Sequence, residues 1–258
     1  WANPTLKKFG TVQDLYYWVC DDELDTVMLL QNYFSAFYPF LNSQTQGLIS
    51  IYDKDGELLG TKSFSLARYG GVKFRISNLL RELQVQSINK FGTLEVNIEI
   101  PKEVLRHISD YKSFYFWDRF YICYTNAKGH VSFMHGVDKA HIYQYANKNP
   151  RYWYTAPGNH EWAPEIPVDM ADYSKFSVIM INRTPAQADV TLTLYDRSEN
   201  SLSWSTNIKS KAVHRFELAK DVIAGLDQSE MRMRVSGMPS RFGRPVVFKE
   251  FPNGAISA

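Results

Sequence analysis

The sequence predicts an all-β protein: two tandem, internally duplicated antiparallel β-sandwich domains, immunoglobulin-like or jelly-roll-like, with a short helical insertion in the first. The first observation is a repeat. Residues 119–132 (RFYICYTNAKGHVS) recur as residues 244–257 (RPVVFKEFPNGAIS), with one offset of 125 residues and no gap. The second is a series of short alternating apolar runs separated by turn signals, without the strand–helix–strand pattern of a parallel sheet.

The first half contains a series of predicted strands, which cover residues 16–20, 26–32, 47–52, 57–65, 72–76 and 92–100. An Asp-Lys-Asp-Gly turn at residues 53–56 joins two of them, because Asp-Gly supplies the positive φ of a tight hairpin. Residues 1–15 are predicted as a lead-in and residues 33–40 as an aromatic loop.

The second half replays this pattern. Matching runs pair residues 176–182 with 26–32, 190–196 with 47–53, 214–218 with 72–76, and 231–235 with 93–97. The number of residues between matching runs falls from 150 at the first pair to 125 at the last. This decrease indicates two insertions in the first half, namely the aromatic loop near residues 34–40 and a longer one around residues 101–108. The predicted domains are residues 1–145 and 165–258, with residues 146–164 as an aromatic, proline-rich linker.

Residues 101–108 are the best helix candidate. Pro101 is suited to the first helical position, Glu103 lies in the first turn, and Val104, Leu105 and Ile108 form an apolar stripe. The sequence also predicts that Gly129 and Gly254 occupy hairpin turns with positive φ.

Composition narrows the function classes. The 258 residues are 45% hydrophobic with a net charge of +2, and lysine and arginine form no dense run, which disfavours nucleic-acid binding. No apolar run reaches the length of about 20 residues that spans a bilayer, so no transmembrane segment is predicted. Cys20 and Cys123 make neither a disulfide framework nor a zinc cluster; they are predicted to be buried thiols, with a single bridge left open.

The clearest hint of a metal site is the group His135, Asp138 and His141, preceded by His130. Imidazole and carboxylate groups bind divalent transition metals, but His130 and His135 would point to opposite faces of a strand. The sequence therefore predicts no cofactor, with a divalent metal as the alternative. Asp118 and Arg119, in an aromatic run, are a further candidate binding pair, and no motif identifies catalytic residues.

The predicted linker is rich in rings. Tyr152, Trp153, Tyr154 and Trp162 lie among asparagine and arginine residues, as on a saccharide-binding surface. The competing interpretation is that these rings pack between the two domains, which predicts that Trp153 and Trp162 are buried.

These observations favour a non-catalytic binding or structural protein of the cell envelope, with a glycan or another protein as its ligand. The alternative is a saccharide-active or metal-dependent enzyme with a site near His130, His135 and His141. The sequence leaves the ligand and the oligomeric state open.

Overall fold

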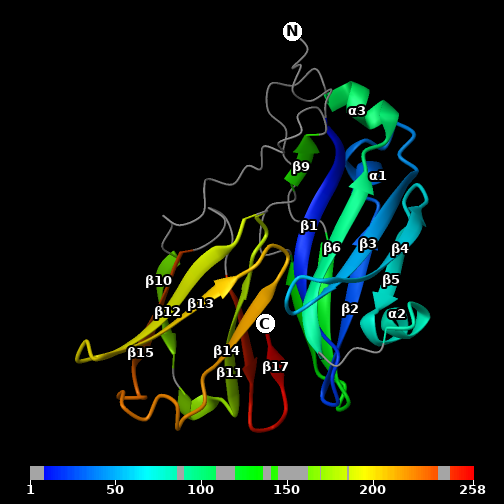
Figure 1. The fold of residues 1–258 in the computed structure, drawn as a ribbon. Coiled ribbons are helices and arrows are strands. Elements are labelled where there is room, and N and C mark those ends of the chain that lie inside the picture. Colours follow the sequence, from blue (N-terminus) through cyan, green and yellow to red (C-terminus); the bar gives the residue numbers. More distant parts are fainter. Residues whose placement is uncertain are drawn as a thin grey trace.

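A computed structural model describes residues 9–85, 90–108, 120–135, 141–144, 162–168, 170–184, 186–237 and 245–258 (Figure 1). For residues 9–11, 13, 108, 135, 141–144, 162–167 and 171 it describes the backbone alone. Every strand pairing in the described residues is antiparallel, so the chain is a mostly β protein with few helices.

The first half holds the described helices and nine strands. The elements are β1 (Phe9–Val19), β2 (Leu24–Gln31), α1 (Tyr33–Phe37), β3 (Thr45–Asp53), β4 (Leu58–Leu66), β5 (Gly71–Arg75), α2 (Ile76–Glu82), β6 (Phe91–Glu99), α3 (Lys102–Ile108), β7 (Phe120–Asn126), β8 (Val131–His135) and β9 (His141–Gln144).

The second half continues with eight strands and one short 3₁₀ turn. The elements are β10 (Trp162–Val168), η2 (Met170–Asp172), β11 (Lys175–Ile181), β12 (Ala188–Asp196), β13 (Ser201–Ile208), β14 (Val213–Glu217), β15 (Met231–Ser236), β16 (Val246–Glu250) and β17 (Ile256–Ser257).

The described strands form four sheets, two in each half. We name them sheet A (β4-β3-β6-β1-β9), sheet B (β5-β2-β7-β8), sheet C (β13-β12-β15-β10) and sheet D (β14-β11-β16-β17). In each half the second strand (β2 or β11) lies between the fifth (β5 or β14) and the seventh (β7 or β16), so strands that are neighbours in a sheet are distant in the chain.

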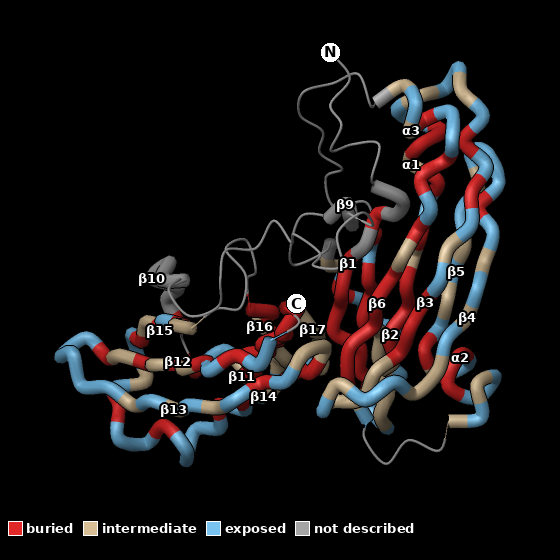
Figure 2. The backbone as a smooth tube through the Cα atoms, turned by 45° about the horizontal axis from the view of Figure 1, so that its top comes forward, coloured by how far each residue is buried: buried red, intermediate tan, exposed pale blue. Residues whose placement is uncertain are grey.

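Buried side chains of sheets A and B share one core. Ile49 and Ile51 of β3 and Leu94 and Val96 of β6 are fully buried, opposite inward-facing residues of sheet B such as Ile122. Figure 2 shows long buried stretches in β1 and β6, while β4 at the edge alternates between intermediate and exposed. A second core, built by sheets C and D, includes Val178, Leu192 and Met233.

The first core extends into the second half. Ile179, Val213, Val246 and Phe248, from the outer face of sheet D, belong to the same cluster as the residues of sheets A and B. The ring of Phe248 meets that of Tyr124 edge-on, with 5.3 Å between centroids. The two halves therefore share a packed boundary, and the C-terminus lies at it (Figure 1).

The tight hairpin turns are stabilised by side-chain oxygens that accept backbone hydrogen bonds and by glycines with positive φ. Asp53 Oδ1 accepts hydrogen bonds from the backbone N–H of Asp55 and Glu57, both at 2.9 Å. Gly129 and Gly254 have φ angles of 82° and 86°, so the prediction of positive φ at both glycines is confirmed.

Several sequence predictions needed correction. The predicted helix at residues 101–108 is confirmed as α3, but the predicted aromatic loop contains α1, and α2 follows β5 without a break. Strand β1 begins at Phe9, inside the predicted lead-in, because the backbone of its first residues pairs with β6 and β9. Strand β10 begins at Trp162, inside the predicted linker, because its backbone pairs with β15.

Candidate functional site

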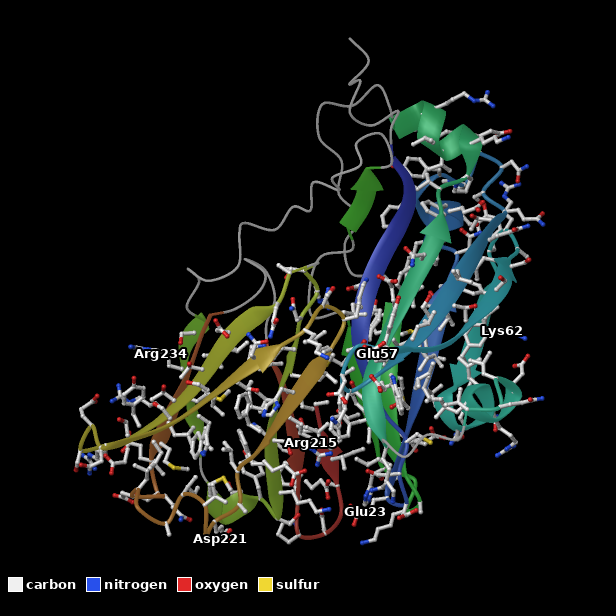
Figure 3. The ribbon with its side chains drawn as sticks, viewed as in Figure 1. Glu23, Glu57, Lys62, Arg215, Asp221 and Arg234 are labelled. Atoms are coloured by element: carbon white, nitrogen blue, oxygen red, sulfur yellow. The ribbon has the colours of Figure 1, made fainter. Side chains whose placement is uncertain are left out.

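The boundary between the halves joins groups of opposite charge. Arg183, just after β11, donates from Nη1 to Asp14 Oδ1 at 2.5 Å and from Nη2 to the carbonyl of Leu15. Lys211 forms an ion pair with Glu95, and Lys175 pairs with Glu23 at 2.5 Å. Figure 3 shows Glu23 and Arg215 near this boundary, with Arg234 on the far side of the second half. In all three pairs the second half carries the cation.

Backbone contacts fix the same boundary. The Val213 N–H donates to the carbonyl of Lys54 at 3.0 Å, and Thr93 Oγ1 donates to the carbonyl of Lys211. The turn at Gly56 lies so close that a Cβ there would stand 2.4 Å from the carbonyl oxygen of Ser210. These contacts hold the halves together and enclose Arg183, Asp14 and Glu95, so we assign the boundary a structural role.

His130, from the predicted metal group, lies in this structural contact. Its Nδ1 is 2.7 Å from the carbonyl oxygen of Gly254, which can only accept, so Nδ1 carries the proton. Asn126 Nδ2 donates to the same carbonyl at 2.8 Å. The Nδ1 atom of His130 is therefore unavailable as a metal ligand, and the ring ties the β7–β8 hairpin to the β16–β17 hairpin.

The remaining predicted site residues are not tested by the structure. Only the backbones of His135, His141 and Trp162 are described, in β8, β9 and β10. The others lie outside the described residues: Asp118, Arg119, Asp138, Tyr152, Trp153 and Tyr154. The metal-dependent alternative therefore stays a prediction. Across the residues that the structure does describe, no three His, Cys, Asp or Glu side chains are grouped to hold a metal ion.

The glycosylation sequon at Asn182-Arg183-Thr184 is buried. Asn182 Nδ2 donates to the carbonyls of Ala186 at 2.7 Å and Ile208 at 2.8 Å, and the side chain is fully enclosed. An amide nitrogen held in this way is inaccessible to a glycosylating enzyme once the chain is folded.

The two cysteines are unbridged thiols. Burial, followed by the charges of Asp25 and Asp21, raises the pKa of Cys20 to about 11. Burial also raises the pKa of Cys123, although the cations Lys73 and Arg75 oppose it. Both environments favour the protonated thiol, so neither cysteine is set up as a nucleophile.

One end of the first half exposes a group of aromatic rings, which we call the aromatic end: Phe37, Phe40 and Tyr69. Phe40 is 68% exposed, Tyr69 63% and Phe37 48%. Phe37 ends α1, Phe40 follows it, and Tyr69 lies in the turn between β4 and β5. Large exposed rings gathered at one place mark binding surfaces more often than chance.

The turn that carries Tyr69 is held rigidly. Tyr69 has a φ of 58°, and its N–H donates to Ser35 Oγ at 2.8 Å, while its hydroxyl donates to the carbonyl of Pro39 at 3.2 Å. Arg68 donates to the same carbonyl, and its guanidinium lies 5.1 Å from the Tyr69 ring centroid. The exposed ring is therefore preorganised beside a cation.

Helix α3 contributes polar groups next to these rings. The His107 ring meets Phe40 edge-on at 5.5 Å and Tyr38 at 5.4 Å between centroids. Glu103 Oε2 accepts from the Asn42 N–H at 2.8 Å. The aromatic end thus combines flat apolar rings with a cation, a carboxylate and an imidazole.

A second exposed apolar surface is the outer face of sheet B. Cross-strand partners share a face, which aligns Lys73, Leu29 and Tyr121 in one row and Arg75, Val27, Cys123 and Phe133 in the next. Phe133 is 59% exposed, Val131 45% and Tyr121 43%. We call these seven residues, together with Val131, the outer face.

Sequence reasoning missed both surfaces for different reasons. The aromatic run at residues 33–40 was visible as an insertion, but its partner Tyr69 lies in a separate turn. The outer face alternates like any half-buried strand, so its exposure depends on what packs against the sheet.

Comparison with known proteins gives no family. No protein-family model matches this sequence, and a search of curated proteins finds no significant match. None of the helices in the described ranges is long and apolar enough to cross a membrane.

Proposed function

We propose that this chain is a non-catalytic binding protein, built from two copies of one β-sandwich domain, and that it binds a glycan through the aromatic end. The observation that carries the proposal is the presence of two exposed rings, Phe40 and Tyr69, in a segment where the Tyr69 hydroxyl and Arg68 both donate to the carbonyl of Pro39. Sugars offer apolar ring faces and many hydroxyls, which suit flat rings surrounded by charged donors and acceptors.

The strand registers support an internal duplication. Met28 pairs with Ile122 in sheet B, and Val178 pairs with Val247 in sheet D, at the offsets of 150 and 125 residues found in the sequence. The same registers align Phe74 with Phe216, and they align Gly92 rather than Thr93 with Met231. The sequence comparison matched residues 231–235 with residues 93–97, and the strand register moves this match by one residue, to 92–96.

Matching side-chain roles support the duplication further. Asn32 and Asn182, offset by 150 residues, each end an inner strand and donate to equivalent carbonyls, those of Leu66 and Ile208. Tyr69 and Lys211, offset by 142 residues, both have positive φ, 58° and 64°. A strained conformation repeated at equivalent turns favours common descent over chance.

The sheet orders favour the jelly-roll-like alternative. In an immunoglobulin domain the first two strands lie in the same sheet, whereas β10 and β11 lie in different sheets. Eight strands in two four-stranded sheets are typical of a jelly roll. We place the first domain within residues 1–145 and begin the second at Trp162, three residues before the predicted boundary, where β10 starts.

The duplication explains why the aromatic end belongs to the first half. Asn32 and Thr45 are separated by α1 and its following loop, but their counterparts in the second half, Asn182 and Ala188, are joined by a short turn. The turn equivalent to that of Tyr69 carries Lys211, which is engaged with Glu95. The first half therefore has both an added aromatic segment and an unobstructed turn.

The proposal is tested by screening the purified chain against immobilised glycans and measuring the affinity of any ligand by calorimetry. Phe40→Ala and Tyr69→Ala should each weaken binding by about tenfold, since each removes one stacking ring. Tyr121→Ala is the matched control, because it removes an exposed ring from a different surface. Absence of glycan binding, or binding unchanged in both variants, would refute the proposal.

A further inference from the structure

We propose that the outer face of sheet B is a homodimer interface, occupied by the outer face of a second copy of this chain around a two-fold axis. This surface is separate from the aromatic end, so the inference does not depend on glycan binding.

The first argument comes from the corresponding face in the second half. Leu29, Tyr121 and Cys123 occupy the same register positions in sheet B as Ile179, Val246 and Phe248 in sheet D. Those three residues of sheet D are buried against β-strands of the first half. The chain therefore uses this kind of face for docking once, whereas on the counterpart face Tyr121 remains 43% exposed.

The second argument is the composition of the exposed face. Tyr121 and Phe133 flank the smaller Cys123, and Val131 extends the apolar area along β8. In the second half the counterparts of Tyr121 and Phe133 are the smaller Val246 and Ala258. Large exposed rings are thus present on this face of sheet B, and aromatic residues are enriched at the centres of protein interfaces.

The third argument is the distribution of charge, which favours a second copy in one orientation. The cations Lys73 and Arg75 lie on β5, at the opposite edge of sheet B from Phe133 on β8. A two-fold axis parallel to the strands places β5 of one copy over β8 of the other. This rotation keeps each residue's position along the strands. Arg75 of one copy then faces Phe133 of the other, Lys73 lies one strand away from the other copy's Tyr121, and like charges are kept apart.

The boundary within the chain offers a precedent for this contact. The counterpart of Lys73 is Arg215. Burial raises the pKa of Tyr17, in the first half, to about 12, and the charge of Arg215 and its hydrogen bond to the Tyr17 hydroxyl oppose that rise. A cation at this position of the sheet therefore already meets an aromatic side chain across a docked face.

The edge of the sheet favours face-on docking. Beside β8 lies β17, where the Ala258 N–H donates to Ser132 Oγ at 2.8 Å. This neighbour occupies the flank along which an added strand would approach, so the partner is expected to cover the face rather than extend the sheet.

Sedimentation equilibrium of the full chain over the micromolar range tests the proposal. The unmodified chain should dimerise, and Phe133→Lys should raise the dimer Kd by about 30-fold or more, because it buries a charge in the interface opposite the partner's Arg75. Leu58→Lys is the matched control: it adds the same charge at an equally exposed apolar site on β4 and should leave the Kd unchanged. Circular dichroism and thermal unfolding verify that both variants fold.

A monomer at every concentration would overturn the proposal, as would a dimer that Phe133→Lys leaves intact. If Phe133→Lys fails to fold, Tyr121→Ser serves as the second variant and should raise the Kd without adding a charge. Glycan binding should be the same in Phe133→Lys as in the unmodified chain, so the failure of either proposal can be told from the failure of the other.

Discussion

Arg183 and Asp14 form a buried ion pair that joins the two halves of the chain. The Nη1 atom of Arg183 lies 2.5 Å from Asp14 Oδ1, with the two side chains 4% and 0% exposed. A second guanidinium nitrogen donates to the Leu15 carbonyl. Because each charge is enclosed by the other half, neither can be solvated if its partner is removed.

Arg183→Met should therefore lower the free energy of unfolding by about 3–5 kcal/mol, since it leaves a buried carboxylate without its cation. Urea unfolding followed by circular dichroism measures this change. Combining it with Asp14→Leu should recover much of the loss, because the uncompensated charge is then gone. Arg197→Met is the control; the Arg197–Glu230 pair is exposed at 3.9 Å, and its loss should change stability by less than about 0.5 kcal/mol. A small cost for Arg183→Met would contradict the structural role of the pair.

Gly129 and Gly225 provide a matched test of backbone strain. Neither would bring a new Cβ within 4 Å of another group, but only Gly129 has a positive φ, 82°. Gly129→Ala should destabilise the chain by about 1 kcal/mol, the cost of the left-handed conformation. Gly225→Ala should be neutral or stabilise by up to about 1 kcal/mol through the unfolded state. Equal effects of the two substitutions in thermal unfolding would argue against the hairpin geometry.

His214 should make stability depend on pH. Burial, and then the charge of Lys54, lower its pKa in the folded state, so folding favours the neutral ring. Its contribution is complete above the unfolded value of about 6.5 and is lost as the pH falls through and below it, because the unfolded chain then binds the proton more readily. The difference in unfolding free energy between His214→Gln and the unmodified chain should thus vary between about pH 7.5 and 5.5. A difference independent of pH would rule out this assignment.

Cys20 should react slowly with thiol reagents although it is partly exposed. A pKa near 11 leaves about 100-fold fewer thiolates than an ordinary cysteine at pH 8. We expect slow alkylation by iodoacetamide in Cys123→Ser, which retains Cys20 alone, and a steep acceleration as the pH rises toward 11. The same variant in urea should react at the ordinary rate, and rapid labelling of the folded form would show that the thiol is not protected.

Much of the local structure followed from the sequence. Alternation predicted β3, β5 and β6, the Asp-Gly turn predicted the β3–β4 hairpin, and Pro101 with its apolar stripe predicted α3. These features depend on residues close together in the chain. The helix α1 was missed because its residues resemble an aromatic loop, and α2 because it follows β5 without a turn signal.

The candidate surfaces required the tertiary structure. Alternation in β6 predicts that Thr93 and Glu95 face solvent, yet both are buried, because Lys211 of the second half docks on them. Tyr121 and Phe133 show the opposite case. Both are apolar side chains of alternating strands, yet both are exposed. A pattern reports that a face is apolar, but not which other face covers it.

By itself, the sequence determined that this chain is rich in short antiparallel strands, where its sharp turns lie and which segments resemble each other. Those properties come from backbone preferences and side-chain spacing along a few residues. Only the tertiary structure decided the order of strands in the sheets, the pairing of Asp14 with Arg183, and the hydrogen bond from Arg68 to the carbonyl of Pro39. Such contacts join residues from 29 to 169 positions apart, and their energies depend on shape and burial that no local pattern encodes.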